Sequence, residues 1–258
     1  MGTRWYPKFG GKGGNQAVAV AKAGVASRLF GAVGDDDFGQ FLRAHLRAGG
    51  VDDAFVATLP GAASGMSVAI MDTAGDYAAT IVSGANLAID PAGLADEPLW
   101  HDVGLLILQN EVTDTLNLAA ATHARARGIR ILLNAAPART LPAALIPLID
   151  ILVVNAVEAQ MMGTAPISCL ATAAQAAQQL ATQFDCVIVT AGALGLAAFG
   201  ADATTLTLPA EIVTVISSHG AGDAFIGTLA AQLVQGAALP TAAHAASHAA
   251  ALHVSRKA

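Results

Sequence analysis

The sequence predicts an α/β protein with a mostly parallel central sheet between two layers of helices and a small β lid. Short, continuously apolar runs such as residues 103–108 alternate with longer segments of helical spacing. Continuous apolar runs are typical of strands buried on both faces, and their alternation with helices favours parallel β–α–β units. Two strand-like runs, 67–71 and 77–82, flank the turn-forming residues 72–76 and predict a hairpin outside that rhythm.

The expected helices each have a local reason. In the second of them, Phe38, Phe41, Leu42 and Leu46 fall on one face, and Gly128 ends the third. The first follows a glycine-rich segment, the fourth is rich in Ala and Gln, and the last follows a turn of small residues. The helices are expected over residues 17–23, 38–48, 113–127, 170–184 and 224–234.

The expected strands are the short apolar runs that lie between these helices. Each is four to six residues long and bounded by polar or small residues, as buried strands are. They cover residues 29–33, 103–108, 129–133, 151–154, 186–189 and 212–216. The sequence contains no evident linker or repeat, so we expect a single domain over residues 1–258, with lid segments at about 4–10 and 64–83.

Composition excludes several classes of protein. The 258 residues carry 13 Lys+Arg and 19 Asp+Glu, a formal net charge of −6, and 54% are hydrophobic. Such a chain is too apolar to be disordered and too acidic to neutralise a nucleic-acid backbone. The longest stretch without charged side chains, 224–255, is broken by Gly236 and Pro240, so we expect no membrane span. The two cysteines and the absence of a secretory pattern favour the cytoplasm.

Two glycine-rich segments are the candidates for chemistry. Residues 10–16 (GGKGGNQ) open an apolar helix, and residues 220–223 (GAGD) stand between a strand and a helix. Backbone N–H groups at a helix start attract anions, and small residues allow an anion to come close. Read alone, the first segment could be a flexible turn, and Asp223 could only complement the helix dipole. The functional alternative is a ligand cradle with Lys12 and Asn15 as donors, and Asp223 as a general base beside an anion hole.

Together the two segments resemble the two signatures of the PfkB carbohydrate kinases, in the form found in ribokinases. Four intermediate segments agree with this resemblance and come in the same order, namely VGDDDFG at 33–39, NAAPAR at 134–139, NAVEA at 155–159 and TAGALG at 190–195. The resemblance implies a ribokinase-like three-layer sandwich. It also implies ATP-dependent phosphorylation of a sugar, with D-ribose giving ribose 5-phosphate.

The resemblance further implies a role for each matching residue. Asp223 would be the base that deprotonates the sugar hydroxyl, and the amides of Gly220, Ala221 and Gly222 would form the anion hole. Sugar contacts would come from Gly11, Lys12, Gly13, Gly14, Asn15, Glu111 and Asp223. Nucleotide contacts would come from Asn155, Thr190, Ala191, Gly192, Ala193, Leu194, Gly195 and Gly222. Glu158 would act on Mg²⁺, through water, and ATP with Mg²⁺ and a small sugar would be the partners.

Three departures from the family pattern bear on activity. Compared with the family pattern, the chain is short at both ends. We expect it to lack the first core strand, the Asn-x-Asp motif that contacts the sugar and the final loop that binds the cation. Ser217 stands where the second signature usually begins with Asp, so the monovalent cation (K⁺) site is expected to be incomplete. We therefore expect impaired sugar binding, and a homodimer through the lid that the short N-terminus weakens.

Two other readings stay open beside ribokinase activity, and a third is disfavoured. The chain could act on another sugar or on a nucleoside within the same family. It could also be a non-catalytic remnant that binds nucleotide or sugar. A dinucleotide-binding oxidoreductase would suit the β–α–β rhythm, but the Gly-x-Gly-x-x-Gly fingerprint is absent.

Overall fold

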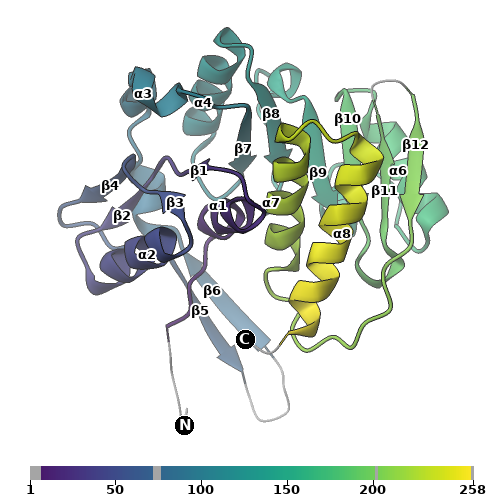
Figure 1. Ribbon diagram of the computed structural model, residues 1–258, viewed down its shortest axis with the longest axis horizontal. Helices are drawn as coiled ribbons and strands as arrows, with labels where there is room; N and C mark the ends of the chain where they lie inside the picture. The colour runs from purple at the N-terminus through teal and green to yellow at the C-terminus, as the bar shows by residue number, and fades with distance from the viewer. Residues whose placement is uncertain (1–6, 72–76, 201–202, 257–258) are drawn as a thin grey trace.

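A computed structural model describes residues 7–71, 77–200 and 203–256. Its central sheet has six strands in the order β12-β11-β10-β9-β8-β7 (Figure 1). Four neighbouring strands run parallel, and the last two add to their edge in antiparallel fashion. The strands are β7 (Leu105–Gln109), β8 (Arg130–Asn134), β9 (Ile151–Asn155), β10 (Cys186–Thr190), β11 (Leu196–Phe199) and β12 (Thr205–Leu208). The mostly parallel sheet that the sequence predicts is confirmed.

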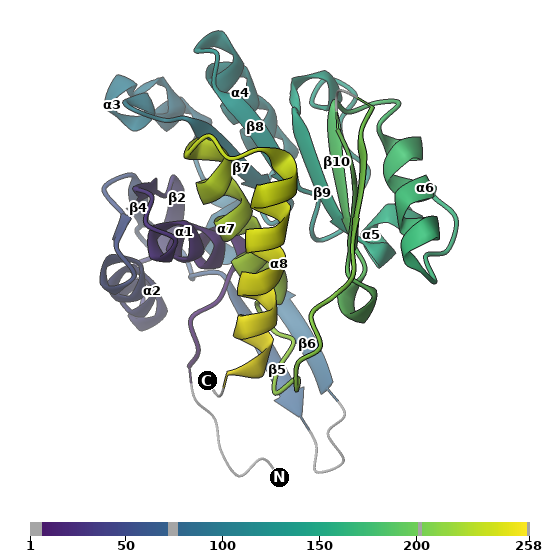
Figure 2. The same ribbon diagram turned by 45° about the vertical axis from the view of Figure 1, so that its right-hand side comes forward.

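Helices cover both faces of this sheet, as Figure 2 shows. Because side chains alternate along a strand, Ile131 and Leu133 pack into one core with α4 (Asp114–Ala126) and α6 (Leu170–Leu180). Leu132 points the other way, into a second core with α7 (Ala221–Val234) and α8 (Leu239–Ser255). A shorter helix, α5 (Ala156–Met161), follows β9 directly. The continuous apolar runs are therefore explained by two cores, which confirms the three-layer fold.

Residues 12–59 build a smaller unit beside the sheet. It consists of α1 (Lys12–Lys22), β1 (Ser27–Arg28), β2 (Gly31–Gly34), α2 (Asp37–Ala48), β3 (Val51–Asp52) and β4 (Val56–Leu59). β1 pairs with β3 and β2 with β4, both in parallel. Apolar side chains of α1, α2 and the strands form a third core, which includes Ala17, Val33 and Leu46. This packing places the start of α1 next to the sheet.

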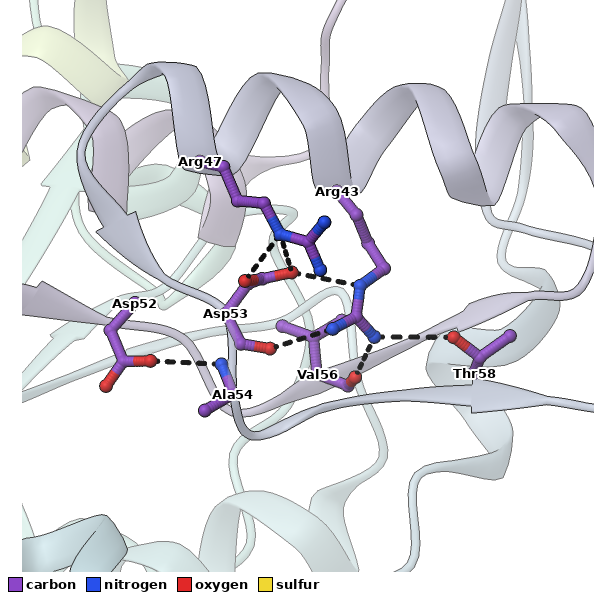
Figure 3. A network of polar contacts seen from close by, with 7 residues as sticks. All are labelled: Arg43, Arg47, Asp52, Asp53, Ala54, Val56 and Thr58. Atoms are coloured by element: carbon purple, nitrogen blue, oxygen red, sulfur yellow. Dashed lines mark hydrogen bonds and ion pairs between the residues drawn. The ribbon is translucent and has the colours of Figure 1, made fainter.

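An ion-pair network ties α2 to the turn between β3 and β4 (Figure 3). Asp53 accepts hydrogen bonds of 3.0 and 3.1 Å from Arg47 Nε, and Arg43 Nε lies 2.9 Å from Asp53 Oδ2. Arg43 also donates to the backbone carbonyl oxygens of Asp53 and Val56. The hydrogen bond from Arg47, followed by the charges of both arginines, holds the pKa of Asp53 below its ordinary value although burial opposes this.

The predicted hairpin is present as β5 (Met66–Met71) and β6 (Tyr77–Val82), and its predicted turn at 72–76 lies outside the described residues. The two strands pair only with each other in the described part of the chain and extend away from the larger sheet (Figure 1). Exposed apolar side chains remain on them, with Ile81 at 65% exposure. The lid role of this hairpin stays a prediction. Short helices complete the fold: η1 (Gly84–Ala88), η2 (Pro91–Ala95), α3 (Glu97–Trp100), η3 (Ile146–Leu148) and η4 (Gly192–Leu194).

A cavity of about 530 Å³ lies between β7 and residues 27–30. Helices α1 and α7 line one side of it, and α4 and Trp100 line another. In the described residues β7 pairs only with β8, so its other edge faces this cavity. The sheet is therefore interrupted between β7 and the β2–β4 pair, beside the start of α1.

The strand expected at 212–216 is wrong. This segment forms no ladder, and Ile212 and Val215 are exposed. The backbone N–H groups of Ile216 and Ser217 instead donate to the carbonyl oxygen of Val254 near the end of α8. The β11–β12 hairpin, which the sequence reading did not predict, takes up the edge beside β10, so an apolar run alone does not place a strand in the sheet. Over the described ranges, no helix combines the length and hydropathy needed to cross a membrane.

Candidate active site

The glycine-rich segment near the N-terminus is mostly helix, not a loop. The helix was predicted to begin at residue 17, but α1 begins at Lys12. Gly11 precedes it with φ of +85°, a conformation that L side chains rarely adopt. Gly13 and Gly14 therefore lie in the first turn, where backbone N–H groups lack helical acceptors, and the N–H of Asn15 is the first to donate within the helix, to the carbonyl oxygen of Gly11 at 3.0 Å. Gly14 also admits the ring of Phe9, because a Cβ there would lie 2.9 Å from Phe9 Cζ.

The second glycine-rich segment also starts its helix earlier than expected. α7 begins at Ala221 and not at residue 224, and Gly220 precedes it in the left-handed conformation with φ of +83°. Ala221, Gly222 and Asp223 form the first turn, and the Asp223 carboxylate therefore stands at the positive end of the helix dipole. His253 Nε2 of α8 donates a 2.9 Å hydrogen bond to the carbonyl oxygen of His219 and so links the end of α8 to the turn that precedes α7.

Two side-chain amides of α1 hold the carboxylate of Asp223. Asn15 Nδ2 donates to Asp223 Oδ2 at 2.9 Å, and Gln16 Nε2 donates to Asp223 Oδ1 at 3.0 Å. The two glycine-rich helix starts, about 200 residues apart in sequence, are thereby brought together at one carboxylate. Asn15, expected at the sugar, thus also contacts the expected base.

Glu111 lies beside this pair. Its Oε2 accepts a 2.7 Å hydrogen bond from the backbone N–H of Lys12, the first residue of α1. Burial raises the pKa of Glu111 above its ordinary value, the contacts with Lys12 oppose this, and the negative charge of Asp223 adds to it. Two carboxylates and a lysine thus share the start of α1.

Asn155 and Glu158 form a capping box at the start of α5. Glu158 N–H donates to Asn155 Oδ1, and Asn155 N–H donates to Glu158 Oε2, both at 2.8 Å. Glu158 is only 8% exposed, and burial raises its pKa against the opposing hydrogen bond from Asn155 and the charge of Lys12. The motif expected at nucleotide and metal therefore has a structural role as well.

The segment from Thr190 to Gly195 begins with the last residue of β10. Gly192, Ala193 and Leu194 form η4, and the turn is closed by a 2.7 Å hydrogen bond from Ala191 N–H to the carbonyl oxygen of Gly195. Gly195 has φ of +110°, and a Cβ there would lie 2.0 Å from the carbonyl oxygen of Leu208. Only glycine fits this close approach, which fixes the shape of the loop.

Four polar residues end the four parallel strands at the same edge of the sheet. They are Gln109, Asn134, Asn155 and Thr190. Ligands of open parallel sheets bind at this carboxyl edge, which accounts for the position of the site. The sequence analysis assigned no role to Gln16, Gln109 and Asn134. A signal for Gln109 and Asn134 exists in the sequence, because a single polar residue ends each strand (LLILQ, RILLN, ILVVN, CVIVT).

The donor set fits a magnesium ion that comes with a nucleotide. Within the described ranges no three His, Cys, Asp or Glu side chains gather as a protein-only metal site. Mg²⁺ in phosphoryl-transfer sites takes one or two carboxylates, waters and the phosphates themselves. The buried carboxylate of Glu158 suits that pattern. The hydroxyl oxygen of Ser217, the residue expected to leave the K⁺ site incomplete, accepts a hydrogen bond from the backbone N–H of His219 at 3.3 Å.

A carboxylate beside the N-terminus of a helix, at the carboxyl edge of a parallel sheet, is an arrangement suited to a kinase that phosphorylates a small alcohol. Residues 3–258 match the family described as pfkB family carbohydrate kinase, and the chain belongs to that family of ATP-dependent sugar kinases.

Individual relatives agree with this. The chain is 31% identical to Mus musculus ribokinase over 233 residues, which cover 89% of this chain and 72% of the mouse protein. It is 32% identical to Salmonella typhi deoxyribokinase over 230 residues, covering 88% and 74% of the two chains. A structure of Arabidopsis thaliana ribokinase complexed with ribose and ATP superposes with a TM-score of 0.89 at 26% identity, over 96% of this chain and 82% of that one.

Proposed function

We propose that this protein transfers the γ-phosphoryl group of ATP to the 5-hydroxyl of D-ribose, which gives ADP and ribose 5-phosphate. The observation that carries the proposal is the Asp223 carboxylate, which lies in the first turn of α7 and is held by Asn15 and Gln16. A general base must lie within hydrogen-bond reach of the hydroxyl, and an anion site must be near it. One helix start supplies both.

The proposed reaction follows from these positions. Asp223 takes the proton of the sugar 5-hydroxyl as the oxygen of that hydroxyl attacks the γ-phosphorus. The bond from that phosphorus to the oxygen bridging it to the β-phosphorus breaks, and ADP leaves. The backbone N–H groups of Gly220, Ala221 and Gly222 hold the phosphoryl oxygens, and the N–H of Ala221 first leaves the carbonyl oxygen of Ser218, to which it donates at 3.3 Å. A positioned base contributes about 10²- to 10⁴-fold in rate.

The sugar contacts are proposed at the start of α1. Gly11, Lys12, Gly13, Gly14 and Asn15 would surround the hydroxyl groups with backbone and side-chain donors. Glu111 would accept from a sugar hydroxyl, since its carboxylate already lies beside Lys12 N–H. The burial that raises its pKa also removes competing water, which strengthens hydrogen bonds to a sugar.

The nucleotide is proposed along the carboxyl edge of the sheet, from Asn155 to the turn of Thr190, Ala191, Gly192, Ala193, Leu194 and Gly195. Glu158 would hold Mg²⁺ through water, and the ion would neutralise charge on the phosphates. For K⁺ we propose at most weak binding, because Ser217 brings a hydroxyl and no charge. A dimer through the hairpin stays a proposal supported by the exposed Ile81.

One relative favours a second candidate sugar, 2-deoxy-D-ribose. The Salmonella typhi deoxyribokinase is as similar to this chain as the ribokinases are. A phosphoryl acceptor at C5 is common to both sugars, so the site around Asp223 serves either. Discrimination depends on groups that contact the 2-hydroxyl, and a site that bonds a hydroxyl rejects the analogue that lacks it.

An assay of ADP release decides the proposal. Purified protein with ATP and Mg²⁺ is given D-ribose, 2-deoxy-D-ribose or inosine, and the product is identified by mass. We expect a pentose 5-phosphate, and a loss of at least about 10²-fold in kcat for Asp223→Asn. Phosphorylation of inosine alone would overturn the pentose assignment. Full activity of Asp223→Asn would overturn the assigned base.

A further inference from the structure

Gln16 lies at the centre of a buried amide network that reaches Asp223. Its side chain is 1% exposed, among the most buried polar groups in the described structure. Nε2 donates to Asp223 Oδ1 and to Asn134 Oδ1, each at 3.0 Å, and Oε1 accepts from Gln109 Nε2 at 2.8 Å. Both N–H groups of the amide and its oxygen are therefore in use.

The orientation of this amide is fixed by its partners. If the Gln16 amide were turned over, Oε1 would face two oxygens, Asp223 Oδ1 and Asn134 Oδ1, with no proton between them. Asn134 is itself oriented, because its Nδ2 donates to the backbone carbonyl oxygen of Val153 at 3.4 Å. The network thus has one consistent set of donors and acceptors, which a buried network needs to be stable.

The network links the sheet to the carboxylate of the proposed base. Gln109 ends β7, Asn134 ends β8, and Val153 belongs to β9. Hydrogen bonds therefore connect the Gln16 amide to three strands of the sheet. Asn15 donates to the other carboxylate oxygen, Oδ2, but Asn15 also belongs to the proposed sugar site. Gln16 is enclosed and contacts the carboxylate on the side of the sheet.

We propose that Gln16 is a positioning residue for phosphoryl transfer, which fixes the orientation of the Asp223 carboxylate relative to the sheet. The inference rests on the proposed function, because it gives Gln16 a task only if Asp223 is the base. Misplacement of a catalytic group by about 1 Å can reduce the rate about 10²-fold. Removing the Gln16 amide is therefore expected to lower kcat about 10- to 100-fold and to leave the sugar KM within about 3-fold.

The test compares Gln16→Met with Thr164→Val. Methionine keeps the length of the side chain without its donors. Thr164 is the control, because it is a buried polar residue at 7% exposure whose hydroxyl donates to the backbone carbonyl oxygen of Ala165, outside the Gln16 network. If the loss in Gln16→Met reflected only a weakened fold, Thr164→Val would lower kcat to the same extent at equal loss of Tm. That outcome would overturn the inference.

A double variant identifies the path of the effect. If Gln16 acts through Asp223, then Gln16→Met has no further effect on kcat in an Asp223→Asn background. An additive loss would show an independent role and would overturn the inference. An inactive wild type, or a fully active Asp223→Asn, would instead overturn the proposed function and the positioning role with it.

A spectroscopic measurement checks the hydrogen bond without any turnover. In amide-selective NMR spectra, we expect the Gln16 side-chain protons to exchange slowly with solvent and to move upfield in Asp223→Ala. Side-chain signals of Gln16 that do not respond to Asp223→Ala would refute the contact. That result would leave the proposed kinase activity to be judged by the ADP assay.

Discussion

Glu111 Oε2 accepts a hydrogen bond from the backbone N–H of Lys12 across 99 residues of sequence. The bond joins the segment that follows β7 to the first residue of α1, which follows the left-handed Gly11. A carboxylate at a helix N-terminus is stabilised by the orphan N–H groups and by the dipole there. Glu111 thus anchors the start of α1, and we propose that it also accepts from a sugar hydroxyl.

Glu111→Gln separates these two roles. Glutamine keeps an acceptor for Lys12 N–H but carries no charge, so we expect the ribose KM to rise about 10-fold or more, the value of one charge-assisted hydrogen bond. Burial raises the pKa of Glu111 in the folded state, so its ionised form destabilises the fold above the ordinary pKa of 4.5. The variant should therefore gain in Tm relative to wild type as pH rises from 4 to 8. An unchanged KM would exclude a sugar contact.

Gly220→Ala and Gly222→Ala form a matched pair at the proposed anion hole. At Gly220, φ is +83° and a Cβ would lie 2.9 Å from His253 Nε2, so alanine is expected to destabilise the fold by about 1–2 kcal/mol. At Gly222 a Cβ meets open space, and alanine gains about 1 kcal/mol of helix propensity. Gly222→Ala should nevertheless lower kcat, because the methyl group obstructs approach to the backbone N–H groups. Calorimetry and the ADP assay measure both effects, and a fully active Gly222→Ala would place the phosphoryl group elsewhere.

Glu158→Gln tests the proposed magnesium contact. Glutamine also serves in a capping box, so the start of α5 should stay folded. Burial raises the pKa of Glu158, and removal of its charge should leave Tm equal or higher at neutral pH. Activity should then require a higher Mg²⁺ concentration for half-saturation. Thermal unfolding and a magnesium titration of the rate check this prediction, and an unaltered titration would contradict it.

Asp53→Asn should weaken the α2 unit without touching the site. The hydrogen bond from Arg47 and the charges of both arginines lower the pKa of Asp53, so its stabilising effect is present above pH 3.8 and is lost as pH falls through the lowered value. We expect a loss of about 1–3 kcal/mol at pH 7 and a smaller difference from wild type at pH 3. Urea unfolding at the two pH values measures it, with the exposed Asp185→Asn as control. Equal losses at both pH values would argue against the ion pair.

Much of the architecture could be predicted from sequence because local patterns carry it. Each of the parallel strands β7 to β10 is a continuous apolar run, since it packs on both faces, and each was expected within a few residues of its place. The hairpin of β5 and β6 followed from turn-forming residues between two strand-like runs. The two glycine-rich motifs were sufficient to indicate the family, because their residue types and order are specific.

The failures have two causes. Residues 212–216 resemble a strand, but no sheet edge receives them, and the backbone N–H of Ile216 donates to the carbonyl oxygen of Val254 in α8. Helices α1 and α7 begin several residues earlier than periodicity indicates, and each is preceded by a glycine with positive φ, Gly11 or Gly220. Strand pairing is thus settled by neighbours that are remote in sequence, whereas these helix starts depend on the local backbone, which apolar periodicity does not report.

The sequence by itself determined the layers, the family and the residue that we propose as the base. Only the tertiary structure decided what holds that residue, since Gln16 lies 207 residues from Asp223 and 118 from Asn134. No periodicity encodes such contacts. They arise because the packing of α1 against α7 and the register of β7, β8 and β9 bring fixed amide groups within hydrogen-bond distance of one carboxylate, and hydrogen bonds act only at that distance.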